Sequence, residues 1–275
     1  MKLAAMTLGC PTWDLDTILK KFKTYGFDGI DFRGLQNDLD ITQTTAFTTD
    51  LAATARKIAD FGLLVSGISS SITACDPAKR AANIEEAKRT IPVAIALGAN
   101  NIRIFGGAPA DPCIQQEAAK IGLDCINAIL ALPGASQLQW LFETHDHWVR
   151  GEHAKLLLDA IPSPNFGALW DLGHTYRVGQ ETPEQTWAAI GNRVRYTHIK
   201  DASFDHAHPH AMADGWRYVL PGTGQLLLEH SVKLLKYHGY NGWLLCEHEK
   251  RWHPTLPEPE VIFPYFIQWI KPLIA

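Results

Sequence analysis

Four short hydrophobic runs, each followed by a side chain that can bind a divalent metal, constrain this chain more than any other feature. The runs are Leu138–Phe142 before Glu143, Phe166–Trp170 before Asp171, Val194–Thr197 before His198, and Gly242–Cys246 before Glu247. Short apolar runs between helical segments are typical of buried parallel strands. In α/β barrels the carboxyl ends of such strands carry the chemistry. Four such residues on successive strands therefore indicate one shared site.

Glycines separate the helical segments from the apolar runs. Gly26, Gly62, Gly98 and Gly239 each follow an amphipathic segment and precede a short apolar run. A glycine just past a helix adopts the left-handed conformation without a Cβ penalty, so each one marks a helix-to-strand turn. This alternation predicts eight strands and eight helices.

The predicted elements cover most of the chain. The first four strands are Leu3–Leu8, Gly29–Arg33, Leu63–Ser70 and Asn101–Phe105, and the other four are the runs above, the third of them continuing to Asp201. The helices are Asp14–Tyr25, Asp50–Phe61, Lys79–Leu97, Ile114–Leu132, His153–Ile161, Pro183–Gly191, Leu226–His238 and Val261–Ile274. Either Asp14 or Thr12 can cap the first helix. Pro92 predicts a kink or a late start in the third.

Strands that alternate with helical crossovers imply a parallel sheet, and eight of them imply closure. We therefore expect the α/β class and a single (β/α)8 TIM barrel, one domain spanning residues 1–275. A doubly wound open sheet is the alternative. It lacks support because no glycine-rich dinucleotide loop follows the first strand.

Composition excludes several classes of protein. The net charge of −4 gives no sign of a nucleic-acid surface, and no apolar stretch approaches the ~18 residues of a membrane span. The five cysteines are odd in number and form no CxxC pair, which indicates reduced thiols and a cytoplasmic protein. Gly9-Cys10 could mark a lipoprotein site, but a first barrel strand fits the N-terminus better.

The four strand-end residues predict one divalent metal ion. Behind apolar runs, the carboxylates of Glu143, Asp171 and Glu247 must be paired or ligated, because a lone buried charge costs several kcal/mol. Three carboxylates in one barrel mouth would also repel one another, and a cation removes that conflict. His198 adds a nitrogen, so the donor set favours Mn, Mg, Co or Zn over a thiolate-binding metal. Open positions would accept water or two substrate oxygens.

Further polar residues near the runs are candidates for substrate binding. His145 lies two residues past Glu143 and Lys200 two past His198, so each points to the same side of its strand as the metal-binding residue. His174 lies just beyond Asp171. All three could bind substrate hydroxyls or negative charge, or could be solvated loop residues.

The long connection Ala202–Gln225 contains a histidine-rich tract, Asp205–His210. We expect a mobile lid rather than a second metal site, because such a connection has no fixed geometry. Arg217 could reach from this lid into the mouth to meet an anionic or hydroxyl-rich ligand. The segment Leu220–Gly224 lacks the ending of a phosphate loop and is interpreted as a turn.

At these residues the chain resembles the xylose isomerase-like barrel superfamily, and in particular its sugar (phosphate) isomerase/epimerase branch. The matching stretches are Gly26–Phe32, Phe142–His145, Trp170–His174, Thr197–Asp201 and Gly239–Glu247. The resemblance covers nearly the whole chain and is specific for fold and metal site, but not for substrate.

The resemblance implies specific roles for individual residues. Glu143, Asp171, His198 and Glu247 would hold the metal, and the two glutamates would also form the acid/base pair. His174 and Arg217 would match substrate-contacting positions. Glu249, two residues past Glu247, is a rival ligand, and Glu247 is preferred because it directly follows the apolar run.

The expected activity is isomerisation or epimerisation of a small sugar, keto-sugar or polyol through a metal-stabilised enediolate. A hydrogen beside a carbonyl is weakly acidic, and a glutamate on each face can remove and return it. If the same intermediate expelled a hydroxide, the enzyme would be a dehydratase of an inosose- or dehydroshikimate-like substrate. A non-catalytic sugar-binding barrel is a further alternative.

Two other properties are expected from particular residues. Apurinic-site endonucleases share this barrel, but their metal site also uses histidines at the ends of the earlier strands. Here those ends carry Arg33, Ser69–Ser71 and Phe105–Gly107, so we expect no nucleic-acid partner. Aromatic residues near the C-terminus, interpreted as exposed, permit a homo-oligomer: Phe263, Tyr265 and Trp269.

Overall fold

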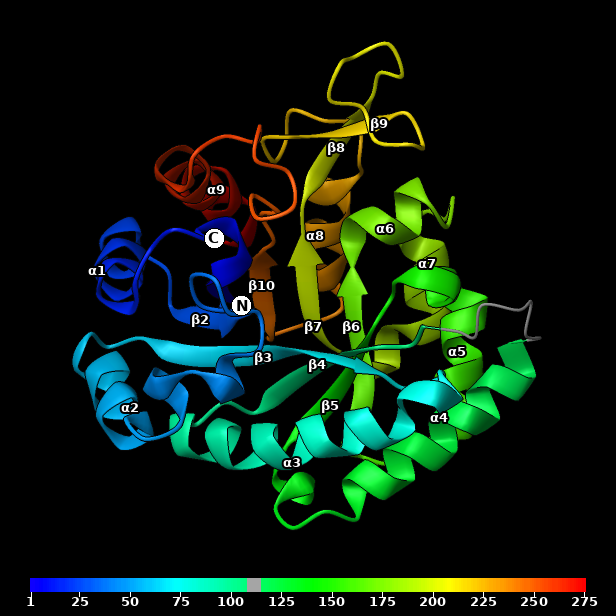
Figure 1. Cartoon of the computed structure of the whole chain (residues 1–275). Helices are drawn as coiled ribbons and strands as arrows, with labels where there is room; N and C mark the ends of the chain where they lie inside the picture. Colours follow the sequence, from blue (N-terminus) through cyan, green and yellow to red (C-terminus); the bar gives the residue numbers. More distant parts are fainter. Residues whose placement is uncertain (108–114) are drawn as a thin grey trace.

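A closed barrel of eight parallel strands lies at the centre of the computed structural model (Figure 1). The structure describes residues 1–107 and 115–275. The barrel strands are β1 (Lys2–Met6), β2 (Gly29–Phe32), β3 (Leu64–Thr73), β4 (Asn101–Phe105), β5 (Gln139–Glu143), β6 (Phe166–Asp171), β7 (Val194–Ile199) and β10 (Trp243–Cys246). They neighbour one another in chain order, and β10 closes the barrel by pairing with β1. The predicted (β/α)8 TIM barrel is confirmed.

Helices cover the outside of the barrel (Figure 1). They are α1 (Leu15–Tyr25), α2 (Leu51–Asp60), α3 (Arg80–Leu97), α4 (Gln115–Leu130), α5 (Gly151–Ala160), α6 (Leu172–Arg177), α7 (Pro183–Ile190), α8 (Leu228–Tyr237) and α9 (Pro259–Ile274). Short 3-10 turns add Thr7–Gly9, Ile41–Gln43, Thr45–Phe47, Pro77–Lys79, Ala135–Gln137, Asp146–Trp148 and Gly191–Arg193. Only α6 among the described α-helices has no predicted counterpart. Ile114, the predicted start of the fourth helix, lies outside the described residues, and so does the cysteine Cys113.

The predicted helix boundaries follow local chemistry. The Asp14 side chain caps α1 by accepting a hydrogen bond from the Thr17 backbone N–H at 2.8 Å. The four predicted turn glycines, Gly26 among them, all have positive φ angles, as the left-handed turn requires. Pro92 lies inside α3, which begins at Arg80, so the expectation of a late start at this proline is wrong.

Side chains of the barrel strands alternate between two cores. An inner cluster fills the barrel and consists of Ala4, Met6, Leu8, Leu141, Leu169, Tyr196 and Leu245. A larger outer cluster packs between strands and helices and includes Trp140 and Phe142. These two aromatic residues therefore face the helices, and the inward-facing Leu141 is the one that shares its side of β5 with Glu143.

Each of the four metal-binding candidates lies two residues past an inward-facing member of the inner cluster. Glu143 follows Leu141 in this way. The other pairs are Leu169 with Asp171, Tyr196 with His198, and Leu245 with Glu247. Because strand side chains alternate with a period of two, all four candidates point into the barrel mouth directly above its apolar filling.

The predicted seventh strand ends earlier than expected, and a hairpin follows it. β7 stops at Ile199, and a two-stranded antiparallel sheet forms from β8 (Asp201–Phe204) and β9 (Trp216–Val219). This hairpin projects beyond the carboxyl end of the barrel (Figure 1). The expectation that the connection lacks fixed geometry is therefore wrong for β8 and β9.

Two further expectations concern buried residues. Phe263 is fully buried against Phe22 and Phe27, so interpreting it as an exposed residue available to an oligomer is wrong. The described cysteines are all buried and form no disulfide with one another: Cys10, Cys75, Cys125 and Cys246. Among the described helices, none is long and apolar enough to cross a membrane.

Candidate metal centre

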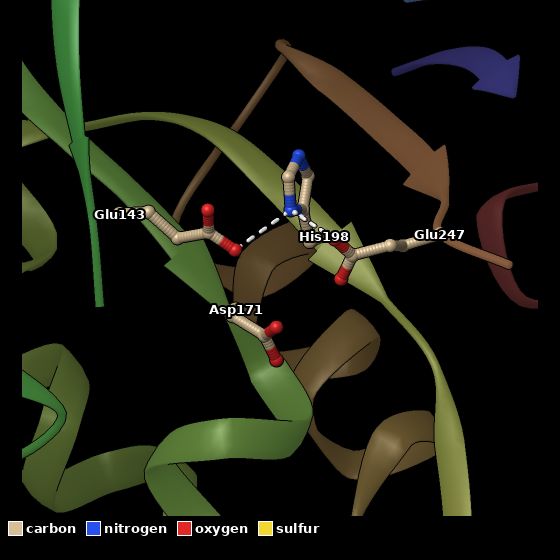
Figure 2. Close-up of side chains that lie close together, drawn as sticks. All are labelled: Glu143, Asp171, His198 and Glu247. Carbon is tan, nitrogen blue, oxygen red and sulfur yellow. Dashed lines mark hydrogen bonds and ion pairs between the residues drawn. The ribbon is translucent and has the colours of Figure 1, made fainter. Parts of the chain in front are cut away.

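The four predicted ligands meet at the carboxyl end of the barrel. Glu143, Asp171, His198 and Glu247 each offer one ligand atom, and these atoms all lie within 4.8 Å of one another. In Figure 2 the two glutamates approach the histidine from opposite sides, with Asp171 below. Among the described residues this is the one such group of three or more potential ligands.

His198 lies between the two glutamates. Its Nδ1 atom is 3.0 Å from Glu143 Oε1 and 3.3 Å from Glu247 Oε1 (Figure 2). Burial opposes a charged imidazole, but the two carboxylates outweigh it and raise the pKa of His198 to about 10. Nδ1 is therefore the nitrogen that faces the shared ligand space.

Asp171 is positioned by the start of α6. Its Oδ1 atom accepts hydrogen bonds from the backbone N–H groups of Gly173 and His174, both at 2.8 Å. Its own backbone N–H donates to Thr144 Oγ1 at 2.9 Å. Helix capping therefore uses one carboxylate oxygen and leaves the other, Oδ2, directed at the site.

The residues fit a divalent metal ion. Asp171 Oδ2 is buried and has no hydrogen-bond partner among the described residues, although the Lys200 ammonium lies 3.1 Å away. A buried carboxylate oxygen without a hydrogen bond is costly unless a cation binds it. Three carboxylates and one imidazole, all nearly buried, are the oxygen and nitrogen donors that Mn²⁺, Co²⁺, Zn²⁺ and Mg²⁺ accept.

Lys200 supplies positive charge at one side of the centre. Its ammonium group lies 2.7 Å from Glu247 Oε2, 2.7 Å from Glu249 Oε1 and 3.1 Å from Asp171 Oδ2. Burial opposes its charge, but these carboxylates raise the pKa of Lys200 well above its usual range. The predicted substrate-binding lysine thus directly contacts two of the four candidate ligands.

Arg103 supplies positive charge at the opposite side, and sequence reasoning missed it. Its Nε atom is 3.3 Å from Glu143 Oε2, and its guanidinium stacks 3.9 Å from the centroid of the Phe105 ring. One feature of the sequence could have identified Arg103: it is a charged residue in the middle of the apolar run Asn101–Phe105. In the structure it lies at an inward-facing position of β4.

Glu249, the rival of Glu247, lies outside the group of four. Its Oε1 atom accepts hydrogen bonds from Lys200 and, at 3.1 Å, from the Tyr218 hydroxyl. Its Oε2 atom is 3.6 Å from His253 Nε2. Both oxygens are therefore directed at other partners, which favours Glu247 as the ligand.

The two predicted histidines line one flank of the site. His174 Nδ1 lies 3.2 Å from Asp171 Oδ2, and burial lowers the pKa of His174 well below its usual range. The His145 and His174 ring centroids are 4.5 Å apart. His145 Nδ1 also pairs with Asp146 Oδ1 at 2.6 Å. His174 thus contacts a candidate ligand directly, whereas His145 reaches the centre through His174.

Arg217 is not brought to the metal centre in this structure. Its Nε atom pairs at 3.7 Å with Asp205 Oδ2 within the connection, and it lines a surface cavity of about 420 Å³ with His208 and His210. The neighbouring Tyr218, on the other face of β9, is the residue that contacts Glu249.

The segment 220–224 forms a turn, as expected. The backbone N–H groups of Gly222 and Gly224 donate to Asp201 Oδ2 at 2.8 and 2.9 Å. Because this carboxylate already occupies the donors that a phosphate would need, the turn is closed to that role.

Comparison with protein families supports the resemblance seen in the sequence. The sequence model of the family described as xylose isomerase-like TIM barrel matches residues 19–273. This chain belongs to that family. No curated protein matches the sequence significantly.

Solved structures of the xylose isomerase-like fold are similar over almost the whole chain. The probable 3-DHS dehydratase AsbF from Bacillus anthracis superposes with a TM-score of 0.79 at 19% identity, covering 98% of each chain. The IOLI protein with a binding zinc atom gives a TM-score of 0.81 at 17% identity, covering 100% of this chain and 98% of that one. A D-psicose 3-epimerase solved in the presence of D-fructose gives 0.76 at 13% identity, covering 100% and 99%. At these identities the likeness establishes the fold.

Proposed function

We propose that this chain is a divalent-metal-dependent isomerase or epimerase of a small sugar, keto-sugar or sugar derivative. The observation that carries the proposal is the placement of Glu143 and Glu247 on opposite sides of one buried ligand space (Figure 2). Relatives of the fold include a zinc-binding protein and a 3-epimerase, which supports the choice of metal and substrate class.

In the proposed reaction each of these residues would have a specific role. A cation bound by Glu143, Asp171, His198 and Glu247 would act as a Lewis acid, stabilising the negative charge that develops when a proton beside the carbonyl leaves. Glu143 and Glu247 would remove and return that proton from two faces of the substrate. Return to the other face inverts the centre, and return to the neighbouring carbon isomerises the sugar.

Neighbouring cations keep both glutamates ionised, as a proton acceptor must be. Burial opposes ionisation, but His198 and Arg103 lower the pKa of Glu143. Lys200 and His198 likewise lower the pKa of Glu247 against the effect of burial. The two proposed acid/base groups therefore have different cationic neighbours, Arg103 on one side and Lys200 on the other.

A dehydratase is the second candidate. It would use the same first proton removal and then expel a hydroxide from the neighbouring carbon. The Lys200 ammonium, 2.7 Å from Glu247, favours it because a cation there can balance the charge of a departing hydroxide. Product analysis separates the two, since dehydration lowers the mass of the product and epimerisation does not.

Metal content and proton exchange test the proposal. We expect about one divalent metal per chain in the purified protein by elemental analysis. In His198→Ala and Glu247→Gln the metal affinity should fall by more than the roughly 10–100-fold typical of losing an outer-sphere partner. The wild type should also catalyse incorporation of deuterium from heavy water into a ketose.

A matched control is Glu229→Gln, which removes an exposed carboxylate from α8 and should leave metal affinity unchanged. The metal proposal fails if the wild type binds none of Mn²⁺, Co²⁺, Zn²⁺ or Mg²⁺. It also fails if both site variants bind the metal as tightly as the wild type.

A further inference from the structure

Arg33 is a buried cation without an ionic partner among the described residues. It follows β2 at the barrel mouth and is 9% exposed. The hydrogen bonds of its guanidinium involve only Nη1, which donates to Ser71 Oγ at 2.9 Å and to Ser69 O at 3.4 Å. A buried guanidinium normally pairs with a carboxylate or binds an anion, since its charge is costly to desolvate.

Thr7, which follows the neighbouring strand β1, holds the backbone of Arg33 in place. The Arg33 backbone N–H donates to Thr7 Oγ1 at 2.9 Å, and the Thr7 hydroxyl donates to Gly34 O at 2.6 Å. Glu86, an acid close enough to affect Arg33, instead accepts a hydrogen bond from the Ser71 backbone N–H at 2.6 Å. Arg33 is thus positioned, and the carboxylates whose charge acts on it, those of Glu86, Glu143 and Asp31, form no ion pair with it.

A second arginine lies close to the first. Burial and the charge of Arg103 lower the pKa of Arg33 to about 9, so the two guanidinium groups repel each other. Arg103 donates from Nη1 to Ser70 O at 3.0 Å and pairs with Glu143. Glu143 is therefore paired with Arg103, and Arg33 has no ion-pair partner among the described residues.

A cavity at the barrel mouth is lined by contact partners of both arginines and by His145 on the flank of the metal centre. It has a volume of about 580 Å³, and its lining includes Ser71, Phe105 and His145. Ser71 is the hydrogen-bond partner of Arg33, and Phe105 is the stacking partner of Arg103. A ligand filling this cavity would contact Ser71, which binds Arg33, and His145 at the flank of the metal centre.

The acids that also line this cavity are already engaged. Asp146 pairs with His145 at 2.6 Å. Asp76 accepts a hydrogen bond from the Ala78 backbone N–H at 3.0 Å, and Lys79 adds a further cation to the lining. Arg33, by contrast, has free hydrogen-bonding capacity, because its Nε and Nη2 atoms have no hydrogen-bond partner among the described residues.

We infer that Arg33, assisted by Arg103, binds an oxyanion group of the substrate, so that the substrate is a phosphorylated or carboxylate-bearing keto-sugar. This inference rests on the proposed function, because it specifies the substrate class of the same site. Guanidinium groups match phosphate and carboxylate oxygens in a bidentate geometry, and such charge-assisted bonds are among the strongest available.

An ion titration tests the inference independently of any sugar. The melting temperature of the full-length protein is measured with increasing inorganic phosphate or acetate, against chloride at equal ionic strength. We expect one of these anions to raise the melting temperature of the wild type and of Arg56→Gln, which alters an exposed arginine of α2. The rise in melting temperature should be absent in Arg33→Gln. It should be partial in Arg33→Lys, which keeps the positive charge but loses the two parallel N–H donors of the guanidinium.

The ion titration decides the inference. No rise above chloride in the wild type overturns it, as does an equal rise in Arg33→Gln. If Arg33→Gln does not fold, Arg33→Lys provides the comparison, and a rise equal to that of the wild type counts against bidentate binding.

Three matched ketoses then identify the source of the anion. D-fructose, D-fructose 6-phosphate and D-fructuronate share their stereochemistry and differ only at carbon 6. With Mn²⁺-loaded protein, we expect the phosphate or the carboxylate to bind at least about tenfold more tightly than D-fructose by calorimetry. That preference should disappear in Arg33→Gln and persist in Arg56→Gln.

Failure of this inference is distinguishable from failure of the proposed function. Equal binding of the three ketoses contradicts the anion site but leaves metal binding and deuterium exchange standing. Conversely, a protein without metal or exchange activity whose phosphate response depends on Arg33 retains the anion site and loses the proposed reaction.

Discussion

At the residue scale, the candidate metal centre contains carboxylates and cationic side chains that are buried together and offset one another's charge. Its buried or nearly buried carboxylates are Glu143, Asp171, Glu247 and Glu249, and its cationic neighbours are Arg103, His198 and Lys200. A bound cation adds to the positive side of this balance. Lys200 and the metal therefore compete for Asp171 and Glu247.

Replacing Lys200 with methionine should reveal this competition. A unit charge about 5 Å from another is worth roughly 3 kcal/mol even at an effective dielectric constant of about 20, so removing the ammonium should strengthen metal binding by about tenfold or more. The metal-free protein should become less stable, because its carboxylates lose a counterion. Calorimetric titration with Mn²⁺ measures the first effect and a melting curve the second.

Lys233→Met is the matched control, because Lys233 is exposed and pairs with Glu229 on the same helix. Unchanged or weaker metal binding in Lys200→Met would show that the lysine supports the site rather than competing for it.

Beneath the metal centre, Asp31 belongs to a separate buried polar network. Its carboxyl oxygens accept hydrogen bonds from Ser69 Oγ at 2.7 Å and from the Tyr196 hydroxyl at 3.0 Å, and Tyr196 also contacts Ser66 at 2.7 Å. Burial raises the pKa of Asp31, and the charges of His198 and Arg103 together with the hydrogen bonds from Ser69 and Tyr196 offset this only in part. The barrel interior therefore makes ionisation of Asp31 less favourable than in water.

The stability contributed by Asp31 should fall as the pH rises. Its pKa in the folded protein lies above the unfolded value of about 3.9, so between those values the native state binds more protons and the free energy of unfolding decreases with pH. Asp31→Asn mimics the neutral acid and should gain stability relative to the wild type across this window. Urea-unfolding midpoints from pH 4 upward measure the difference.

The exposed Asp60→Asn substitution should show no such trend. A constant difference between wild type and Asp31→Asn at every pH would mean that Asp31 has an ordinary pKa in the folded protein.

At the element scale, one carboxylate ties together the two ends of the connection that contains the β8–β9 hairpin. Asp201 accepts backbone hydrogen bonds from Ala202, Gly222, Gly224 and Leu226, at distances from 2.8 to 3.4 Å. It thereby ties the start of β8 to the turn that follows β9. Tyr218 on β9 contacts Glu249, so the position of the hairpin also affects the metal centre.

Asp201→Ala should loosen this connection. Removing the acceptor leaves several backbone N–H groups without partners, at a cost of roughly 1–3 kcal/mol. We expect faster hydrogen exchange at the Gly222 and Gly224 amides and a lower melting temperature. Asp205→Ala, which removes a carboxylate within the connection, should leave those two amides protected; equal exchange in both variants would contradict the anchoring role.

At the scale of the whole molecule, a metal ion would join parts of the chain that are distant in sequence. The candidate ligands come from β5, β6, β7 and the end of β10, and β10 closes the barrel against β1. Binding to the folded state alone must therefore stabilise the entire barrel.

Adding Mn²⁺ to metal-free protein should raise its melting temperature. At about 100 times the dissociation constant the gain is about 2.7 kcal/mol. His198→Ala should lose this response, while Glu229→Gln should retain it. An equal shift in His198→Ala would place the stabilising metal elsewhere. Differential scanning calorimetry provides the measurement.

Much of the site was predictable because it depends on strand periodicity. Glu143 and Glu247 could be located because each directly follows an apolar run, and the runs alternate with helices that end at glycines. Arg103 was not considered and Arg33 was noted only as a strand-end residue, because a charged side chain in or after a short strand does not by itself show whether it is directed into the barrel or at solvent. Arg217 was expected at the mouth, but the structure pairs it with Asp205.

The sequence by itself determined the number and order of the barrel strands, the turns at the glycines and the four residues at the strand ends. These properties follow from local periodicity and backbone preference, which depend only on residues close together in the sequence. Only the tertiary structure decided which cations contact which carboxylates, that Phe263 is buried and that Arg33 lacks an ionic partner among the described residues. Those properties depend on side chains from different strands meeting when the barrel closes, and no local pattern encodes such distances.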